Sequence, residues 1–173
     1  SGWLISVEGL GGIGKTAVAN AVVRSPQLIS RFRDIAWISA KQRSFFPGIG
    51  LEDHQSPALT GETLVDALLE QFDQAQVLTQ SPQEKKVALT RLLKQAPYLI
   101  VIDNLETIVD YQVLLPLLWE ITNPSRILIT SRHSLREYSS IFCLTLKALD
   151  QTETFELIRY EATTRGLSTL AKA

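Results

Sequence analysis

The sequence predicts an α/β fold, a doubly wound parallel sheet of about five strands with helices on both faces. Two observations support this prediction. Short runs of aliphatic and β-branched residues, typical of strands buried on both faces, recur along the chain. Between them lie stretches whose apolar residues recur at helical spacing, and strands that alternate with helices form parallel sheets.

The composition excludes several classes of protein. Of the 173 residues, 45% are hydrophobic and 20% are charged, which is ordinary for a soluble globular domain. The net charge of −1 offers no basic surface for a nucleic acid, and no apolar run reaches the roughly 20 residues of a membrane span. A single cysteine, Cys143, suits a reducing compartment, so we expect a cytoplasmic protein. Because the chain begins at Ser1 and runs almost directly into a strand, we expect a fragment of a longer protein.

The first predicted strand, residues 3–7, leads into a glycine-rich loop and then into a helix that opens at Lys15 or Thr16. The loop fits the pattern G-x-x-x-x-G-K-[ST] and reads Gly9-Leu10-Gly11-Gly12-Ile13-Gly14-Lys15-Thr16.

Strand, loop and helix in this order form a site for the phosphates of a nucleotide. Glycines let the backbone turn its N–H groups inward, and the helix N-terminus adds partial positive charge. Lys15 would reach the β- and γ-phosphates, and the Thr16 hydroxyl would bind Mg²⁺. The alternative is a plain glycine-rich turn with Lys15 in solvent, but motif and context agree on a nucleotide. The predicted nucleotide-binding residues are Gly9, Leu10, Gly11, Gly12, Ile13, Gly14, Lys15, Thr16 and Ala17.

The next segments are predicted to form strands and helices that support the sheet. After a polar turn at Pro26, residues 32–39 predict a second strand. Residues 41–59 predict a long loop, either functional or mobile. A helix is expected over residues 64–72, and a capping box at residues 81–84 opens another. The apolar face of this second helix is predicted to be Val87, Leu89, Leu92 and Leu93.

The remaining elements alternate in the same way. The four aliphatic residues before Asp103 predict a central strand. Residues 114–121 predict a helix despite Pro116. Further strands are predicted over residues 126–132 and 141–146. Asp150 and Glu153 form a second capping box, which starts a helix to about residue 165.

Asp103 ends the central strand, where parallel sheets bind their ligands. An acid that follows an aliphatic strand is the Walker B pattern, so we expect Asp103 and Thr16 to hold the same Mg²⁺. The alternative is that Asp103 only caps the following helix. Position 104 is Asn, and an amide can orient a water molecule but cannot accept its proton. The nearest other carboxylate is Glu106. The sequence therefore favours slow hydrolysis.

Arg132 ends the fourth predicted strand, where its guanidinium could contact a γ-phosphate. There it would distinguish a triphosphate from a diphosphate and stabilise transition-state charge. The alternative is a surface arginine paired with Glu106 or Glu137. The candidate catalytic residues are Asp103, Asn104 and Arg132, and the candidate metal ligands are Thr16 and Asp103.

These motifs, in this order, resemble the STAND class of signalling NTPases and within it the bacterial-type NB-ARC (AP-ATPase) nucleotide-binding domain. Residues 125–132 are similar to the family's sensor strand, so Arg132 matches its sensor-1 arginine. Asp103 and Asn104 stand where many members have two aspartates, and the Asn form resembles the bacterial branch.

The resemblance implies a P-loop domain over residues 1–148 and the first helix of a truncated helical subdomain over residues 149–173. It implies ATP or ADP with Mg²⁺ as ligands, and adenine over guanine rests on it alone. Implied partners are the missing helical and winged-helix subdomains, effector and sensor domains, and an ATP-dependent homo-oligomer. No nucleic acid or membrane partner is implied.

Three functions stay open. A signalling switch, whose nucleotide state controls assembly, is favoured by Asn104, Arg132 and the order of motifs. A conventional AAA-like ATPase that drives mechanical work usually has an acid at position 104. A non-catalytic interaction module would keep its nucleotide only as a structural element. A small-molecule kinase is favoured less, because no second substrate site is recognisable.

Overall fold

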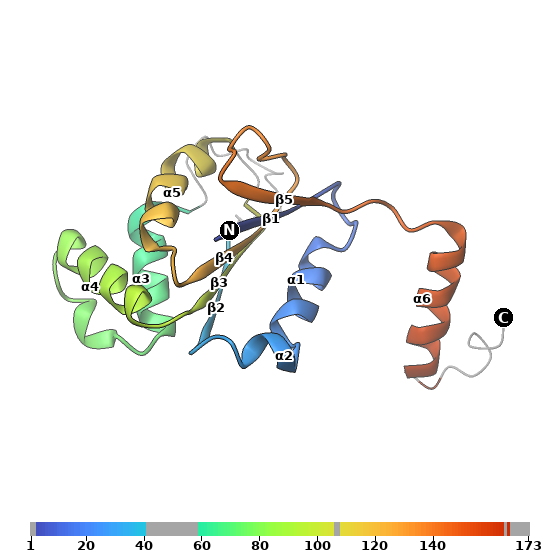
Figure 1. Ribbon diagram of the computed structural model, residues 1–173, viewed down its shortest axis with the longest axis horizontal. Coiled ribbons are helices and arrows are strands. Elements are labelled where there is room, and N and C mark those ends of the chain that lie inside the picture. The colour runs from blue at the N-terminus through green and yellow to red at the C-terminus, as the bar shows by residue number, and fades with distance from the viewer. Residues whose placement is uncertain (1–2, 41–58, 106–107, 165, 167–173) are drawn as a thin grey trace, which may run out of the picture.

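The computed structural model describes residues 3–40, 59–105, 108–164 and 166, with the backbone alone at 108–110. Its strands form one five-stranded sheet of order β2-β3-β4-β1-β5, in which all neighbours pair in parallel (Figure 1). The strands are β1 (Leu4–Glu8), β2 (Ile35–Ser39), β3 (Leu99–Asp103), β4 (Arg126–Ser131) and β5 (Ile141–Thr145). The predicted parallel α/β sheet is confirmed.

Helices cover both faces of the sheet. In Figure 1, α3, α4 and α5 lie on one face and α1 and α2 on the other. The helical elements are α1 (Lys15–Val23), α2 (Pro26–Ile29), α3 (Gly61–Gln71), the 3₁₀ turn η1 (Ala75–Val77), α4 (Pro82–Gln95), α5 (Ile108–Ile121) and α6 (Gln151–Thr164). Helix α5 contains Pro116, as expected. The short α2 stands where a polar turn was predicted, because Pro26 occupies its first turn and Leu28 packs against the smaller core.

Strand β3 lies inside the sheet and is buried along its whole length. Its side chains alternate between two cores: Ile100 and Ile102 join the large core under α3, α4 and α5, and Leu99 and Val101 join the smaller core beside α1. Burial on both faces is the reason that this strand reads as an uninterrupted aliphatic run. The same burial fixes the position of Asp103 at the carboxyl edge of the sheet.

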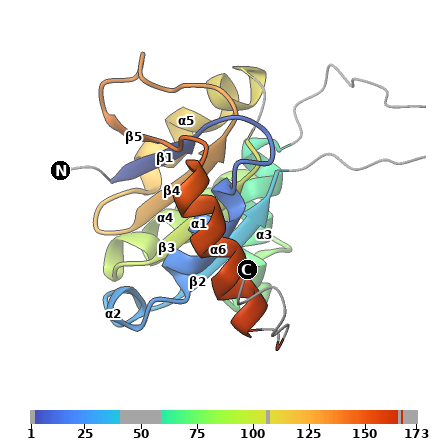
Figure 2. The ribbon, with the colours of Figure 1, turned by 90° about the vertical axis from the view of Figure 1, so that its right-hand side faces the viewer.

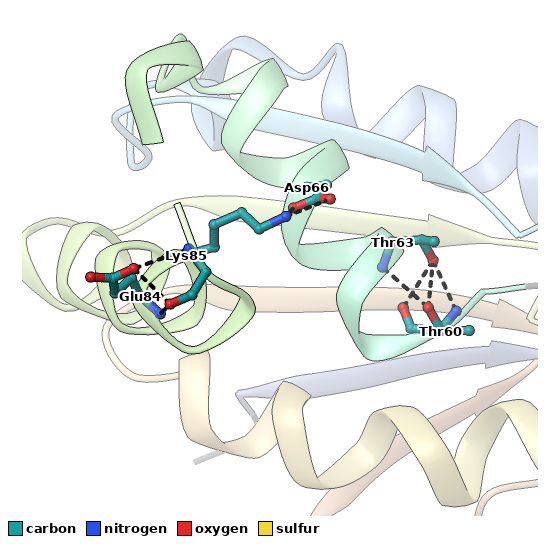
Figure 3. A network of polar contacts seen from close by, with 6 residues as sticks. Thr60, Thr63, Asp66, Glu84 and Lys85 are labelled. Carbon is teal, nitrogen blue, oxygen red and sulfur yellow. Dashed lines mark hydrogen bonds and ion pairs between the residues drawn. The ribbon is translucent and has the colours of Figure 1, made fainter. Parts of the chain in front are cut away.

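Capping boxes start both α3 and α4 (Figure 3). The predicted box at Ser81 and Glu84 is confirmed, since the Glu84 carboxylate accepts from the Ser81 backbone N–H and hydroxyl. These hydrogen bonds hold the pKa of Glu84 below its usual value. Thr60 and Thr63 form the equivalent box at α3. Both helices therefore begin at fixed residues beside the sheet.

The predicted apolar face of α4 is wrong at one position. Val87 is 58% exposed, whereas Lys85 is buried and forms an ion pair of 2.7 Å with Asp66 of α3 (Figure 3). Lys85 shares its helix face with Leu89 and Leu93, which are fully buried, and Val87 lies on another face. The buried face of α4 is therefore the one that carries Lys85, Leu89 and Leu93.

Helix α6 stands apart from the sheet, beyond α1, and Figure 2 views it from its outer side. Its predicted capping box is confirmed, because the backbone N–H groups of Asp150 and Glu153 each bond to the other's carboxylate. Among its described side chains only Ala162 is buried. None of the helices in the described part of the chain has the length and apolarity that a membrane crossing needs.

Two buried serines differ in the hydrogen bonding of their hydroxyl groups. Ser125, before β4, donates its hydroxyl to the Leu93 carbonyl at 2.7 Å and accepts from the Tyr98 N–H at 3.1 Å. It thereby joins the end of α4 to the start of β3. The hydroxyl of Ser6, which is equally buried in β1, has no hydrogen-bond partner within the described residues. A buried hydroxyl contributes to stability only where it is bonded.

We predict that Ser125→Ala lowers the free energy of unfolding by about 1–3 kcal/mol, because it leaves a buried N–H and a buried carbonyl without partners. The matched variant Ser6→Ala should leave this free energy unchanged or raise it slightly. Urea unfolding followed by circular dichroism measures both. Equal losses in the two variants would contradict the assignment of Ser125 as a bridge.

Candidate functional site

The glycine loop runs from the end of β1 to the start of α1. Gly14 is the N-cap of α1 and has a left-handed backbone with φ of 103°, which other residues rarely adopt. Within the described residues no side chain caps this end of α1, and its first turn holds no acid. The partial positive charge of the helix N-terminus is therefore directed at the loop, where an anion would bind.

Lys15 belongs to the loop although it begins the helix. Its side chain is 7% exposed, and its ammonium donates to the carbonyls of Gly9 and Leu10, both at 2.8 Å. The loop itself therefore holds the Lys15 ammonium, which does not extend into solvent. This position adds a full positive charge to the partial charge of the helix end.

Asp103 joins three elements at the carboxyl edge of the sheet. Its Oδ1 accepts from the Thr16 hydroxyl of α1 at 2.8 Å and from the Thr130 hydroxyl of β4 at 2.6 Å. Its Oδ2 accepts from the side-chain amide of Asn104 at 3.1 Å. These bonds join Asp103 to α1, β4 and Asn104.

Asn104 turns the chain sharply out of β3. Its φ of 61° is left-handed, a conformation that Asn tolerates better than most residues. Its backbone N–H donates to the Thr130 hydroxyl at 2.9 Å, so Thr130 binds both Asp103 and Asn104. This hydroxyl therefore fixes the two candidate catalytic residues relative to each other. The expectation for Glu106 lies outside the described residues.

Arg132 directly follows β4 and reaches over the glycine loop. A methyl group built on Gly11 would lie 3.6 Å from the Arg132 Cζ and 3.7 Å from its Nε, which is van der Waals contact distance. Arg132 thus lies against the loop that carries Lys15. It borders a hollow of about 220 Å³ between the glycine loop, the start of α1 and the residue after β3. The hollow is lined by Gly11, Gly12, Gly14, Lys15, Thr16, Asn104 and Arg132.

Other predicted site residues lie outside this lining. Leu10 and Ala17 are exposed, and Gly9 packs against the chain after β5, where an added methyl group would lie 3.0 Å from the Leu146 carbonyl oxygen. Ile13 lies next to Gly9. These residues shape the loop, whereas the residues of the lining face the hollow.

Two residues of the site were not predicted from the sequence. Thr130 is a polar residue inside an otherwise aliphatic strand, two positions before Arg132, and that pattern could have indicated it. Glu8 is a carboxyl residue between an apolar strand and the first glycine; it is 3% exposed and its Oε1 accepts from the Leu135 N–H at 2.6 Å. Both depend on contacts between strands that are distant in sequence.

Cys143 lies on β5 beside Glu8. Burial, then the hydrogen bond and the negative charge of Glu8, raises the pKa of the Cys143 thiol to about 11. The thiol is therefore neutral at physiological pH and a weak nucleophile. It packs, partly buried, against the large core.

The fold and the loop together define the class. A parallel sheet whose first strand leads through G-x-x-x-x-G-K-[ST] into a helix, with an acid at the end of β3, is the arrangement of P-loop nucleotide-binding domains.

The comparisons give the family. The family model of the NB-ARC domain matches residues 1–168, and the chain therefore belongs to the NB-ARC domain family. This confirms the resemblance of its motifs. Curated protein sequences contain no match to it.

Among solved structures, the chain is similar to a signal transduction ATPase with numerous domains (STAND) from Pyrococcus horikoshii, which has a tetratricopeptide repeat sensor. The two share 18% sequence identity with a TM-score of 0.56 over 98% of this chain, a likeness of fold. This chain spans about a quarter of that protein, 24% of its length.

Proposed function

We propose that this chain is the nucleotide-binding core of a STAND signalling switch. It binds ADP or ATP with Mg²⁺, and nucleotide exchange and slow hydrolysis control the assembly of a larger multidomain protein in the cytoplasm. The observation that carries the proposal is the 2.8 Å hydrogen bond between Thr16 and Asp103, because it unites the glycine loop and the end of β3 at one point beside the hollow.

The phosphates bind at the start of α1. The N–H groups of the loop and of the helix N-terminus donate hydrogen bonds to the phosphate oxygens, and the Lys15 ammonium leaves a loop carbonyl to bind the β- and γ-phosphates. The hydrogen bonds of Lys15 to Gly9 and Leu10 support this role, since they keep the ammonium above the loop before any phosphate arrives. Preorganised charge of this kind costs little rearrangement on binding.

The donor set beside the phosphates fits Mg²⁺. Thr16 offers a hydroxyl and Asp103 a carboxylate, and hard oxygen donors of this kind bind Mg²⁺ together with substrate phosphates. When bound there, the ion would neutralise phosphate charge. The described residues contain no group of three or more His, Cys, Asp or Glu side chains that could hold a metal alone, which suits an ion that arrives with its nucleotide.

Slow hydrolysis follows from the residues that line the hollow. Among those described there is no carboxylate, and Asn104 directs its amide at Asp103. Asn104 can orient a water molecule but cannot accept its proton. Slow turnover suits a switch, in which hydrolysis serves as a reset, better than a motor that needs rapid cycles.

Assembly is the output of the proposed switch. Phe155, Leu157 and Ile158 of α6 are each about half exposed, at 49%, 49% and 45%. Such an apolar helix surface supports the proposal that residues 149–173 belong to a helical subdomain that packs against further parts of a longer chain. Exchange of ADP for ATP would then release these contacts and permit an ATP-dependent homo-oligomer.

The test of the phosphate site is Lys15→Ala. We predict that ATP affinity falls by at least about tenfold, because a hydrogen bond to a charged group contributes about 1.5–3 kcal/mol. The matched control is Lys86→Ala, which removes a surface lysine paired with Glu120. Titration calorimetry measures affinity, and circular dichroism verifies that both variants fold. Unchanged affinity in a folded Lys15→Ala protein would contradict the phosphate site.

The test of the sensor is Arg132→Ala. We predict that ATP affinity falls about tenfold more than ADP affinity, because the guanidinium would bind only the γ-phosphate. The control is Arg136→Ala, four residues further along the chain, whose guanidinium donates to Thr145 at 2.9 Å. That variant should bind both nucleotides like the wild type. An equal loss of ATP and ADP affinity in Arg132→Ala would remove its sensor role.

A further inference from the structure

Glu8 is a buried acid without a role in the phosphate site described above. It ends β1, directly before the first glycine of the loop, and is 3% exposed. A buried carboxyl group costs free energy unless it is hydrogen-bonded, so its bonds indicate what it is kept for. The backbone carbonyl of Glu8 accepts from the Leu146 N–H at 2.7 Å, and its side chain accepts from the Leu135 N–H at 2.6 Å.

The hydrogen bond from the Leu135 N–H to the Glu8 carboxylate is relevant to the site because Arg132 stands in the turn between Ser131 and Leu135. At one end of this turn, the Ser131 hydroxyl accepts from the His133 N–H and donates to the His133 carbonyl, both at 2.8 Å. At the other end, the Leu135 side chain is buried in the large core and its N–H is bound by Glu8. Glu8 thus closes the second end of the turn that carries the guanidinium.

The same residue also fixes the glycine loop. Gly9 follows Glu8 without an intervening residue and packs so tightly that an added methyl group would lie 3.0 Å from the Leu146 carbonyl oxygen. Glu8 is therefore joined through its backbone to the loop and through its side chain to the turn of Arg132. Arg132 on this turn lies beside Gly11 of the loop, since a methyl group built on Gly11 would lie 3.6 Å from the Arg132 Cζ.

We propose that Glu8 is a positioning residue that holds the Arg132 turn at a fixed distance from the glycine loop and thereby sets the preference for triphosphate over diphosphate. The proposal rests on the sensor role proposed for Arg132. A purely structural role for Glu8 makes a different prediction: loss of the Leu135 bond would destabilise the fold and weaken ATP and ADP equally.

Three substitutions separate these roles. Glu8→Gln keeps an oxygen acceptor at the same reach. Glu8→Met keeps the length of the side chain but removes the acceptor. Glu8→Asp keeps the carboxylate but is one methylene shorter, so it no longer reaches the Leu135 N–H. Each variant of the 173-residue chain is titrated with Mg-ATP and Mg-ADP, and its unfolding midpoint is recorded without nucleotide.

We expect Glu8→Gln to retain the wild-type ratio of ATP affinity to ADP affinity. In Glu8→Met and Glu8→Asp this ratio should fall about tenfold, as it should in Arg132→Ala. In the double variant Glu8→Met/Arg132→Ala the ratio should be the same as in Arg132→Ala alone, because both substitutions act through the guanidinium of Arg132. If Glu8→Met does not fold, the comparison of Glu8→Asp with Glu8→Gln decides the question.

The outcomes keep the two proposals apart. If Arg132→Ala changes the ratio but Glu8→Asp and Glu8→Met leave it at the wild-type value, Glu8 does not position the sensor. A lowered unfolding midpoint with equal losses for both nucleotides also overturns the inference. If Arg132→Ala itself leaves the ratio unchanged, the sensor role fails first, and the role of Glu8 fails with it.

Discussion

The site depends on the hydrogen bonds around one buried carboxyl group. Asp103 is 4% exposed, and burial of such a group costs several kcal/mol unless partners replace the water it loses. Thr16 and Thr130 donate to one of its oxygens, and Asn104 donates to the other. Because these donors come from α1, β4 and the exit of β3, satisfying the carboxyl group also fixes α1, β4 and β3 against one another.

The parallel sheet explains how residues far apart in the sequence come together at the site. All five strands run in the same direction, so β1, β3 and β4 deliver the glycine loop, Asp103 and Arg132 to one edge of the sheet. The cores on the two faces hold this edge in place through buried residues such as Ile100 and Val101. Asp103 thus stands at the end of a buried strand, whereas Arg132 stands on a turn, where small shifts would change the contact proposed for it with a γ-phosphate.

Much of this could be predicted from the sequence, because the decisive signals are local. The run before Asp103 and the spacing within the glycine loop need no knowledge of distant residues. The local pattern could have indicated Thr130 as a candidate, but the contacts of Thr130 and Glu8 could not be assigned in this way, since their partners lie 27 and 127 positions away. The error at Val87 has a different origin: Val87 was assigned to the buried face for its apolar side chain, although helix periodicity places Lys85, not Val87, on the face of Leu89 and Leu93.

The most direct test of the account is the Mg²⁺ dependence of ATP binding in the wild type and in Asp103→Asn. Titration calorimetry with and without Mg²⁺ measures the affinity of each protein. The account predicts that Mg²⁺ strengthens ATP binding to the wild type and that most of this gain disappears in Asp103→Asn, while the variant still binds ATP through the loop and Lys15. An equal gain from Mg²⁺ in both proteins, or no ATP binding by the folded wild type, would contradict it.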